Sequence, residues 1–152
     1  MYVALVLLQT LVLPVVSGVI ELIVAPSDPI SVFGRWFLFW GVGTRLLVAG
    51  FSQVARPQFT VQNILGSPND GAAQIAQELG FANLSFGVLG ILGFFVPGWA
   101  VPAALAGGLF LGLAGFRHLP KKHPNLKESV ATWSDLLIFA VMAVFVVWSL
   151  LH

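Results

Sequence analysis

Residues Gln74 to Gly93, QIAQELGFANLSFGVLGILG, decide the fold class of this chain. The stretch contains no proline, and about 20 helical residues at roughly 1.5 Å each can cross a hydrocarbon core of about 30 Å. It nevertheless carries a carboxylate, an asparagine and four glycines, which a helix surrounded only by lipid would not need. We therefore predict a membrane-spanning helix at the centre of a helical bundle.

Two different faces run along this predicted helix when its residues are placed about 100° apart. The first is a polar face that contains Gln74, Glu78, Phe81 and Ser85. The second, on the opposite side, consists of small residues and one amide: Ala76, Gly80, Asn83, Gly87 and Gly90. We expect the small face to pack closely against another helix and the polar face to line a small polar interior.

The composition of the whole chain is that of an integral membrane protein. Of the 152 residues, 58% are hydrophobic and 9% are charged, whereas about 25% are charged in an average soluble domain. The net charge is +1 and there is no basic tract, so nucleic acid is not an expected partner. The absence of cysteine excludes disulfides, thiol catalysis and thiolate metal sites.

Apolar runs predict an all-α bundle of five transmembrane helices, four plus an N-terminal one, in a single domain covering residues 1–152. The predicted spans are about 2–24, 32–53, 71–95, 100–116 and 130–151. The first run has no Lys or Arg in front of it, so we interpret it as a membrane helix and not as a cleaved signal peptide.

The distribution of basic residues predicts the orientation in a bacterial inner membrane. The segments after the second and fourth spans carry Arg56, Arg117, Lys121, Lys122 and Lys127, while Arg35 is on the other side. We therefore expect these segments and the N-terminus in the cytoplasm, and the C-terminus outside.

Arg45 lies near the middle of the second predicted span. An arginine at the centre of a membrane helix costs about 2.5–3.5 kcal/mol, while each Leu, Phe or Val returns only about 0.3–0.6 kcal/mol. The free energy of inserting this span by itself is therefore close to zero. We expect Arg45 to face polar partners inside the bundle instead of lipid.

Its candidate partners are Glu78, Asp135 and His118, with Gln74 and Ser85 on the same polar face as Glu78. Their predicted depths differ by about one helical turn, which a long arginine side chain can bridge. Two interpretations stay open. The network either only orients the helices, or it forms a polar cavity for an anion, a proton or a ligand headgroup.

Three further groups are assigned structural roles. Glu21 and Arg35 flank a short link and are expected to form an interfacial salt bridge, and Asn83 is expected to form an interhelical hydrogen bond. Gly108 and Gly112 belong to small-xxx-small patterns that let helix backbones approach closely. We expect them to pack against the small face of the Gln74–Gly93 helix; a homodimer or a contact to another subunit is the alternative.

The sequence carries no catalytic or cofactor signature. The three histidines include no i,i+4 pair and indicate no metal site, and there is no phosphate-binding glycine loop or Ser/His/Asp arrangement at a plausible depth. We therefore expect no cofactor and assign no catalytic residue.

Four segments carry a family resemblance: GRWFLFWGVGTRLLVAGFSQVARPQFT, ELGFANLSFGVLGIL, GGLFLGLAGFRH and SDLLIFAVMAVF. They resemble a family of small bacterial multi-pass membrane proteins of unknown function, loosely similar to DoxX-like proteins. The most specific element is ELGFANL, followed by the residues that match His118 and Asp135. The resemblance implies a helical bundle and transfers no catalytic residues. DoxX-like proteins are linked with membrane redox complexes, but this chain lacks cysteines and a metal-ligand cluster.

Three functions follow as hypotheses. The first is a non-enzymatic accessory subunit or small binding module, in contact with the lipid bilayer and with other membrane subunits or further copies of itself. The second is a small transporter or proton-linked permease that uses Arg45, Glu78 and Asp135 as a relay. The third is a membrane enzyme acting on lipid or quinone.

Overall fold

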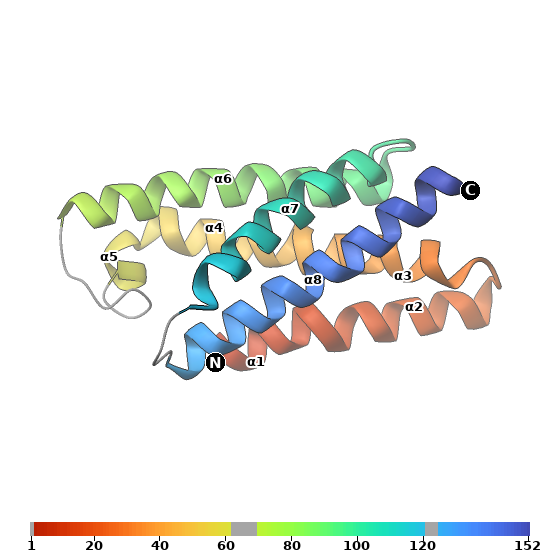
Figure 1. Ribbon diagram of the computed structural model, residues 1–152, viewed down its shortest axis with the longest axis horizontal. Helices are drawn as coiled ribbons and strands as arrows, with labels where there is room; N and C mark the ends of the chain where they lie inside the picture. The colour runs from red at the N-terminus through yellow and green to blue at the C-terminus, as the bar shows by residue number, and fades with distance from the viewer. Residues whose placement is uncertain (1, 62–69, 121–124) are drawn as a thin grey trace.

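The computed structural model describes residues 2–61, 70–120 and 125–152, and within these residues every regular element is a helix (Figure 1). Five helices are long and apolar enough to cross a membrane: Tyr2–Val24, Pro29–Ala55, Gly71–Phe95, Ala100–His118 and Leu126–Leu151. The all-α fold with five membrane spans is therefore confirmed. Lys121 and Lys122, which contribute to the predicted orientation, lie outside the described residues.

The first two spans are each interrupted by a π-helical segment. The elements are α1 (Tyr2–Leu7), η1 (Leu8–Val12), α2 (Leu13–Val24), α3 (Pro29–Phe37), η2 (Leu38–Thr44) and α4 (Arg45–Ala55). The remaining helices are α5 (Pro57–Thr60), α6 (Asp70–Phe95), α7 (Ala100–His118) and α8 (Leu126–Leu151).

Two helices begin earlier than the apolar pattern predicted, because polar residues cap them. The Asp28 side chain accepts a hydrogen bond from the Ser31 N–H at 2.7 Å, and Pro29 occupies the first turn of α3. At α8, Asn125 and Glu128 form a capping box. The second span therefore begins at residue 29 instead of 32, and the fifth at 126 instead of 130.

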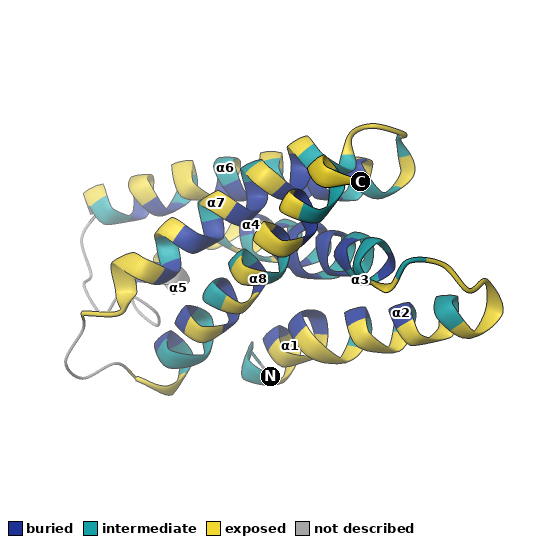
Figure 2. Ribbon diagram, turned by 45° about the vertical axis from the view of Figure 1, so that its right-hand side comes forward, coloured by how far each residue is buried: buried dark blue, intermediate teal, exposed yellow. Residues whose placement is uncertain are grey.

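The second span, α3–η2–α4, occupies the centre of the bundle, so the predicted central position of Gln74–Gly93 is wrong. In the most apolar part of the second span 44% of the residues are buried inside the bundle, whereas in the corresponding part of α6 28% are buried. Figure 1 shows α8 running between the α1–α2 segment and α7, while α6 lies against the second span. Figure 2 shows that buried residues face inward and that exposed ones form the outer faces of α2, α6 and α7.

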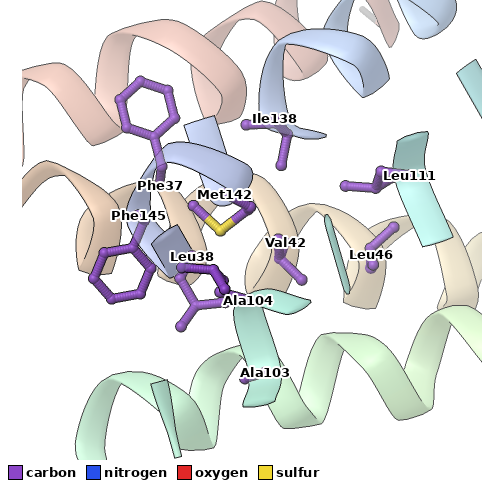
Figure 3. Close-up of a cluster of buried hydrophobic side chains, with 11 residues drawn as sticks. Phe37, Leu38, Val42, Leu46, Ala103, Ala104, Leu111, Ile138, Met142 and Phe145 are labelled. Carbon is purple, nitrogen blue, oxygen red and sulfur yellow. The ribbon is translucent and has the colours of Figure 1, made fainter. Parts of the chain in front are cut away.

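The hydrophobic core lies where the second span meets α7 and α8 (Figure 3). Leu38, Val42 and Ile138 are completely buried in it, and Met142 nearly so. These side chains fill the bundle interior with apolar atoms on the C-terminal side of Asp135 in α8.

The small face of α6 packs on the second span and not on α7. A Cβ atom added at Gly90 would lie 2.7 Å from the Gly43 backbone nitrogen, and one at Gly87 would lie 2.7 Å from the Leu47 nitrogen. Gly80 is equally close to the second span, since its added Cβ would lie 2.8 Å from Val54 Cγ2.

The glycines of α7 face a different neighbour, so their predicted packing against α6 is wrong. Added Cβ atoms at Gly108 and Gly112 would lie 2.8 Å from Met142 Cβ and 2.6 Å from Phe139 Cδ2, both in α8. A small-xxx-small pattern permits close approach to any helix, and the identity of the neighbour depends on the bundle topology.

Candidate functional site

The candidate site is built around Arg45, the first residue after the π-helical segment η2. Its side chain is 9% exposed, and its Nη2 donates hydrogen bonds to Asp135 Oδ1 at 2.5 Å and to Ser134 Oγ at 2.8 Å. Ser134 Oγ in turn donates to the Ala131 carbonyl oxygen at 2.8 Å. The expected pairing of Arg45 with Asp135 is therefore present, and Ser134 is an additional partner.

Local backbone geometry brings Arg45 to this position. The Arg45 N–H donates to the Trp40 carbonyl oxygen, five residues earlier, which is the π-helical pattern. Gly41 and Gly43 lie within the widened turn, and π-helical turns occur often at functional sites. With the helix widened in this way, the guanidinium contacts Ser134 and Asp135 of α8, next to the apolar core.

Polar residues of the first span reach Thr44, the residue before Arg45. Gln9 Nε2 donates to Thr44 Oγ1 at 3.2 Å, and Thr44 Oγ1 donates to the Trp40 carbonyl at 2.9 Å. Gln9 and Thr10 are 6% and 1% exposed. The two π-helical segments, η1 and η2, are thus joined directly beside Arg45.

Two buried polar atoms at this place have no hydrogen-bond partner among the described residues: Arg45 Nη1 and Thr10 Oγ1. Buried polar groups are nearly always paired in proteins, and leaving one unpaired costs about 1–3 kcal/mol. The site therefore has two polar atoms that are free to form further hydrogen bonds, one on the first span and one on the second.

A crevice of about 220 Å³, which we call the η1–α8 crevice, lies beside these residues. Its lining comes from the first span and α8: Leu7, Thr10, Leu11, Ser129, Val130, Trp133, Ser134 and Leu137. Trp133 is 68% exposed and Leu11 is 43% exposed, so the crevice lies at the outer face of the bundle. Through Ser134, it adjoins the Arg45–Asp135 pair.

The predicted contribution of α6 to this site is contradicted. Gln74, Glu78 and Ser85 are exposed on the outer face of α6. Gln74 Nε2 donates to Glu78 Oε1 at 3.2 Å, and Ser85 donates to the Phe81 carbonyl oxygen at 2.9 Å. The two faces of α6 were identified correctly, but the small face turned inward, because only small residues allow the close approach to the second span.

His118 is also outside the network, exposed at the C-terminal end of α7. It contributes no hydrogen bond to Asp135 within the part of the chain that the structure describes.

The remaining predicted contacts are present. Arg35 Nη2 donates to Glu21 Oε1 at 2.5 Å, and Trp36 Nε1 donates to Glu21 Oε2 at 2.6 Å. Asn83 Nδ2 donates to Gln53 Oε1 at 2.6 Å, which joins α6 to α4 as an interhelical hydrogen bond. These hydrogen bonds join neighbouring spans, α2 to α3 and α6 to α4, and none of them includes Arg45.

Sequence reasoning missed Gln9, Thr10 and Ser134. The available signal was the adjacent polar pair Gln9–Thr10 in the otherwise apolar run Tyr2–Val24, and a serine immediately before Asp135. A single hydroxyl is common in membrane helices, so only its neighbours reveal its role. Among the described residues no group of three His, Cys, Asp or Glu side chains is placed to hold a metal ion.

Comparison with known protein families matches residues 4–152 to a family described as "Family of unknown function (DUF6790)". A search of curated proteins found no match. A search of solved structures likewise found none.

Proposed function

This chain belongs to DUF6790, a family of unknown function, and from its site we propose that it is a non-enzymatic membrane protein that acts as a small binding module. The Arg45–Asp135 pair with Ser134 and Thr10 is the proposed binding site. The proposed location is a bacterial inner membrane with the N-terminus in the cytoplasm, supported by the basic residues Arg56 and Arg117 at the ends of α4 and α7. The looser resemblance to DoxX-like proteins stays a prediction.

One observation carries the proposal: the buried and unpaired Thr10 Oγ1 belongs to the lining of a crevice at the outer face of the bundle, and the guanidinium with the unpaired Arg45 Nη1 is hydrogen-bonded to Ser134 of the same lining. An ion-pair network that only oriented helices would be expected to satisfy all its own donors. Unused donors beside an accessible space are the arrangement expected of a ligand site.

The transporter and enzyme alternatives have weaker support. The proposed relay requires Glu78 beside Arg45, but Glu78 is exposed on α6. A lipid or quinone enzyme would need a free general base, whereas Asp135 is engaged by Arg45 at 2.5 Å.

A role as an accessory subunit, or as a homo-oligomer, is the second candidate. The observation that favours it is the polar face of α6, where Gln74 and Glu78 are exposed. Ionisable residues of membrane spans usually face protein or water, so a neighbouring chain on this face would provide their surroundings.

The proposed site is tested with a double variant, Arg45→Met with Asp135→Leu. Replacing a buried ion pair by apolar residues of similar volume is often neutral or stabilising by about 1–4 kcal/mol, so the variant is expected to fold with an unchanged or higher melting temperature. The matched control, Glu21→Gln with Arg35→Gln, removes the other ion pair, whose side chains are 24% and 41% exposed.

The measurement is mass-spectrometric identification of amphiphiles that co-purify with each protein in lipid nanodiscs. We expect a ligand enriched on the wild type and on the Glu21/Arg35 control, and absent from the Arg45/Asp135 variant. Equal enrichment on all three proteins, or enrichment on none, would refute a binding role for this site.

A further inference from the structure

We infer that the ligand of this site is an uncharged acyl lipid, which enters sideways through the η1–α8 crevice and accepts hydrogen bonds through an ester carbonyl oxygen. This inference rests on the binding function proposed above and specifies the chemical class of the ligand. Four features of the site lead to it.

The unpaired atoms require a hydrogen-bond acceptor. A guanidinium nitrogen can only donate, and a threonine hydroxyl can donate or accept. An oxygen with free lone pairs can therefore accept a hydrogen bond from Thr10 Oγ1 in the crevice lining or from Arg45 Nη1 behind Ser134. A carbonyl oxygen has two lone pairs and no hydrogen, so it suits either donor.

The charge of the site favours a neutral ligand. Arg45 is already paired with Asp135 at 2.5 Å, and both side chains are about nine-tenths buried. The pair is neutral as a unit, so an anion attracted by the guanidinium would at the same time be repelled by the nearby carboxylate. An uncharged carbonyl avoids this repulsion and still accepts from Arg45.

The lining of the crevice is suited to an alkyl chain. Most of its residues are apolar, and Leu7, Leu11, Val130 and Leu137 provide aliphatic surface between the two helices. Its volume is about 220 Å³. The crevice therefore accommodates the carbonyl end and a few methylenes, while the rest of the chain extends past Trp133 into the bilayer.

The depth of the site disfavours a charged headgroup. Asp135 follows Glu128, the last charged residue of the first turn of α8, by seven residues, which is about 10 Å along the helix. A phosphate or ammonium group drawn to this depth would have to leave water, which is costly inside the hydrocarbon region. A neutral glycerolipid such as a diacylglycerol can sink to this level.

Native mass spectrometry of the purified full-length protein tests the inference with three probes: dioleoylglycerol, its dialkyl ether analogue without carbonyl groups, and oleate as an anion. We expect dioleoylglycerol to bind best and the ether to bind roughly fivefold to tenfold more weakly, the loss expected for a missing neutral hydrogen bond. Oleate is expected to bind no better than the ether.

Three variants localise the binding. Thr10→Val removes one unpaired hydroxyl without changing the side-chain shape. It is expected to weaken the binding of dioleoylglycerol about fivefold and to leave the binding of the ether analogue unchanged. Leu137→Trp should fill the crevice and abolish binding. Val144→Trp is the matched control on the same helix, because Val144 is 58% exposed and lines a separate apolar groove with Pro29 and Phe33.

Each contrary result has a defined meaning. Equal binding of ester and ether, tighter binding of oleate, or an unchanged affinity in Thr10→Val overturns the inference; in the last case the unpaired atoms are served by water. If such a result is accompanied by an amphiphile that co-purifies with the wild type but not with the Arg45/Asp135 variant, the proposed binding function survives. If no probe binds and nothing co-purifies, both fail.

Discussion

Arg45 shows how a single residue in a membrane helix acquires its partners. Its Nη2 contacts both Ser134 and Asp135, two consecutive residues of α8, which a planar guanidinium with several donors can contact at once. Removing only the carboxylate, as in Asp135→Asn, would leave a buried cation unpaired, and the expected destabilisation is about 3–5 kcal/mol. The double apolar variant avoids this problem.

Asp28, outside the membrane spans, provides a pH prediction at the same scale. Its hydrogen bonds with Ser31 lower the pKa of the Asp28 carboxyl from its ordinary value. Because the pKa is lower in the folded state, the ionised carboxylate stabilises the fold above the unfolded-state pKa, near pH 4. This contribution is lost as the pH falls through the folded-state value.

Asp28→Asn should therefore lower the melting temperature at pH 7, and the difference from the wild type should shrink below pH 4. Asparagine is also a good N-cap residue, so the variant retains the helix cap and lacks only the negative charge and its dependence on pH. Melting curves in detergent between pH 7 and pH 2.5 measure the difference. A difference that stays constant or widens in acid would contradict the assignment.

Between elements, close contact is decided by glycines that face backbone. On α6, a Cβ atom at Gly90 would lie 2.7 Å from the Gly43 nitrogen and 2.8 Å from Gly43 Cα. Backbone atoms of a packed helix cannot move aside as the end of a flexible side chain can. The α6–η2 contact therefore depends on the absence of a side chain at this position.

Gly90→Ala is expected to destabilise the protein. A glycine-to-alanine change adds about 1 kcal/mol of helix propensity, but overpacking a tight contact costs about 1–3 kcal/mol, so we expect a net loss of up to about 2 kcal/mol. Ser85→Ala on the exposed face of the same helix is the control and should leave stability nearly unchanged. Thermal unfolding of the two variants compares them directly; a stabilised Gly90→Ala protein would refute the close α6–η2 contact.

For the whole molecule, the proposed orientation in the membrane rests on which ends of the spans carry basic residues. Ser27 lies in the link between α2 and α3, and Leu119 follows α7; both are exposed. An odd number of spans separates these two positions, since α3–η2–α4, α6 and α7 lie between them. The two positions therefore belong on opposite sides of the membrane.

Single cysteines at these positions test the orientation, because the chain has no cysteine of its own. In intact cells, Ser27→Cys should react with a membrane-impermeant maleimide, and Leu119→Cys should react only after permeabilisation. The opposite pattern would reverse the proposed topology. Reaction of both positions in intact cells would contradict the odd number of spans.

The sequence by itself determined the number of apolar spans, their approximate limits and the class of protein, because about 20 consecutive apolar residues leave the backbone no alternative to a helix in lipid. It also indicated that Arg45 needs a buried partner, since the insertion energy of the second span is close to zero without one. Asp135 was among the candidates because it is one of the few carboxylates within the predicted spans.

Only the tertiary structure decided which faces and which partners meet. A helical wheel separates the polar and small faces of α6 but does not say which one turns inward, and close packing on Gly43 placed Glu78 outside. Thr10 became part of the site through a π-helical turn and a contact between the first span and α8. Such contacts depend on the three-dimensional arrangement of whole helices, and a periodicity within one helix carries no information about its neighbours.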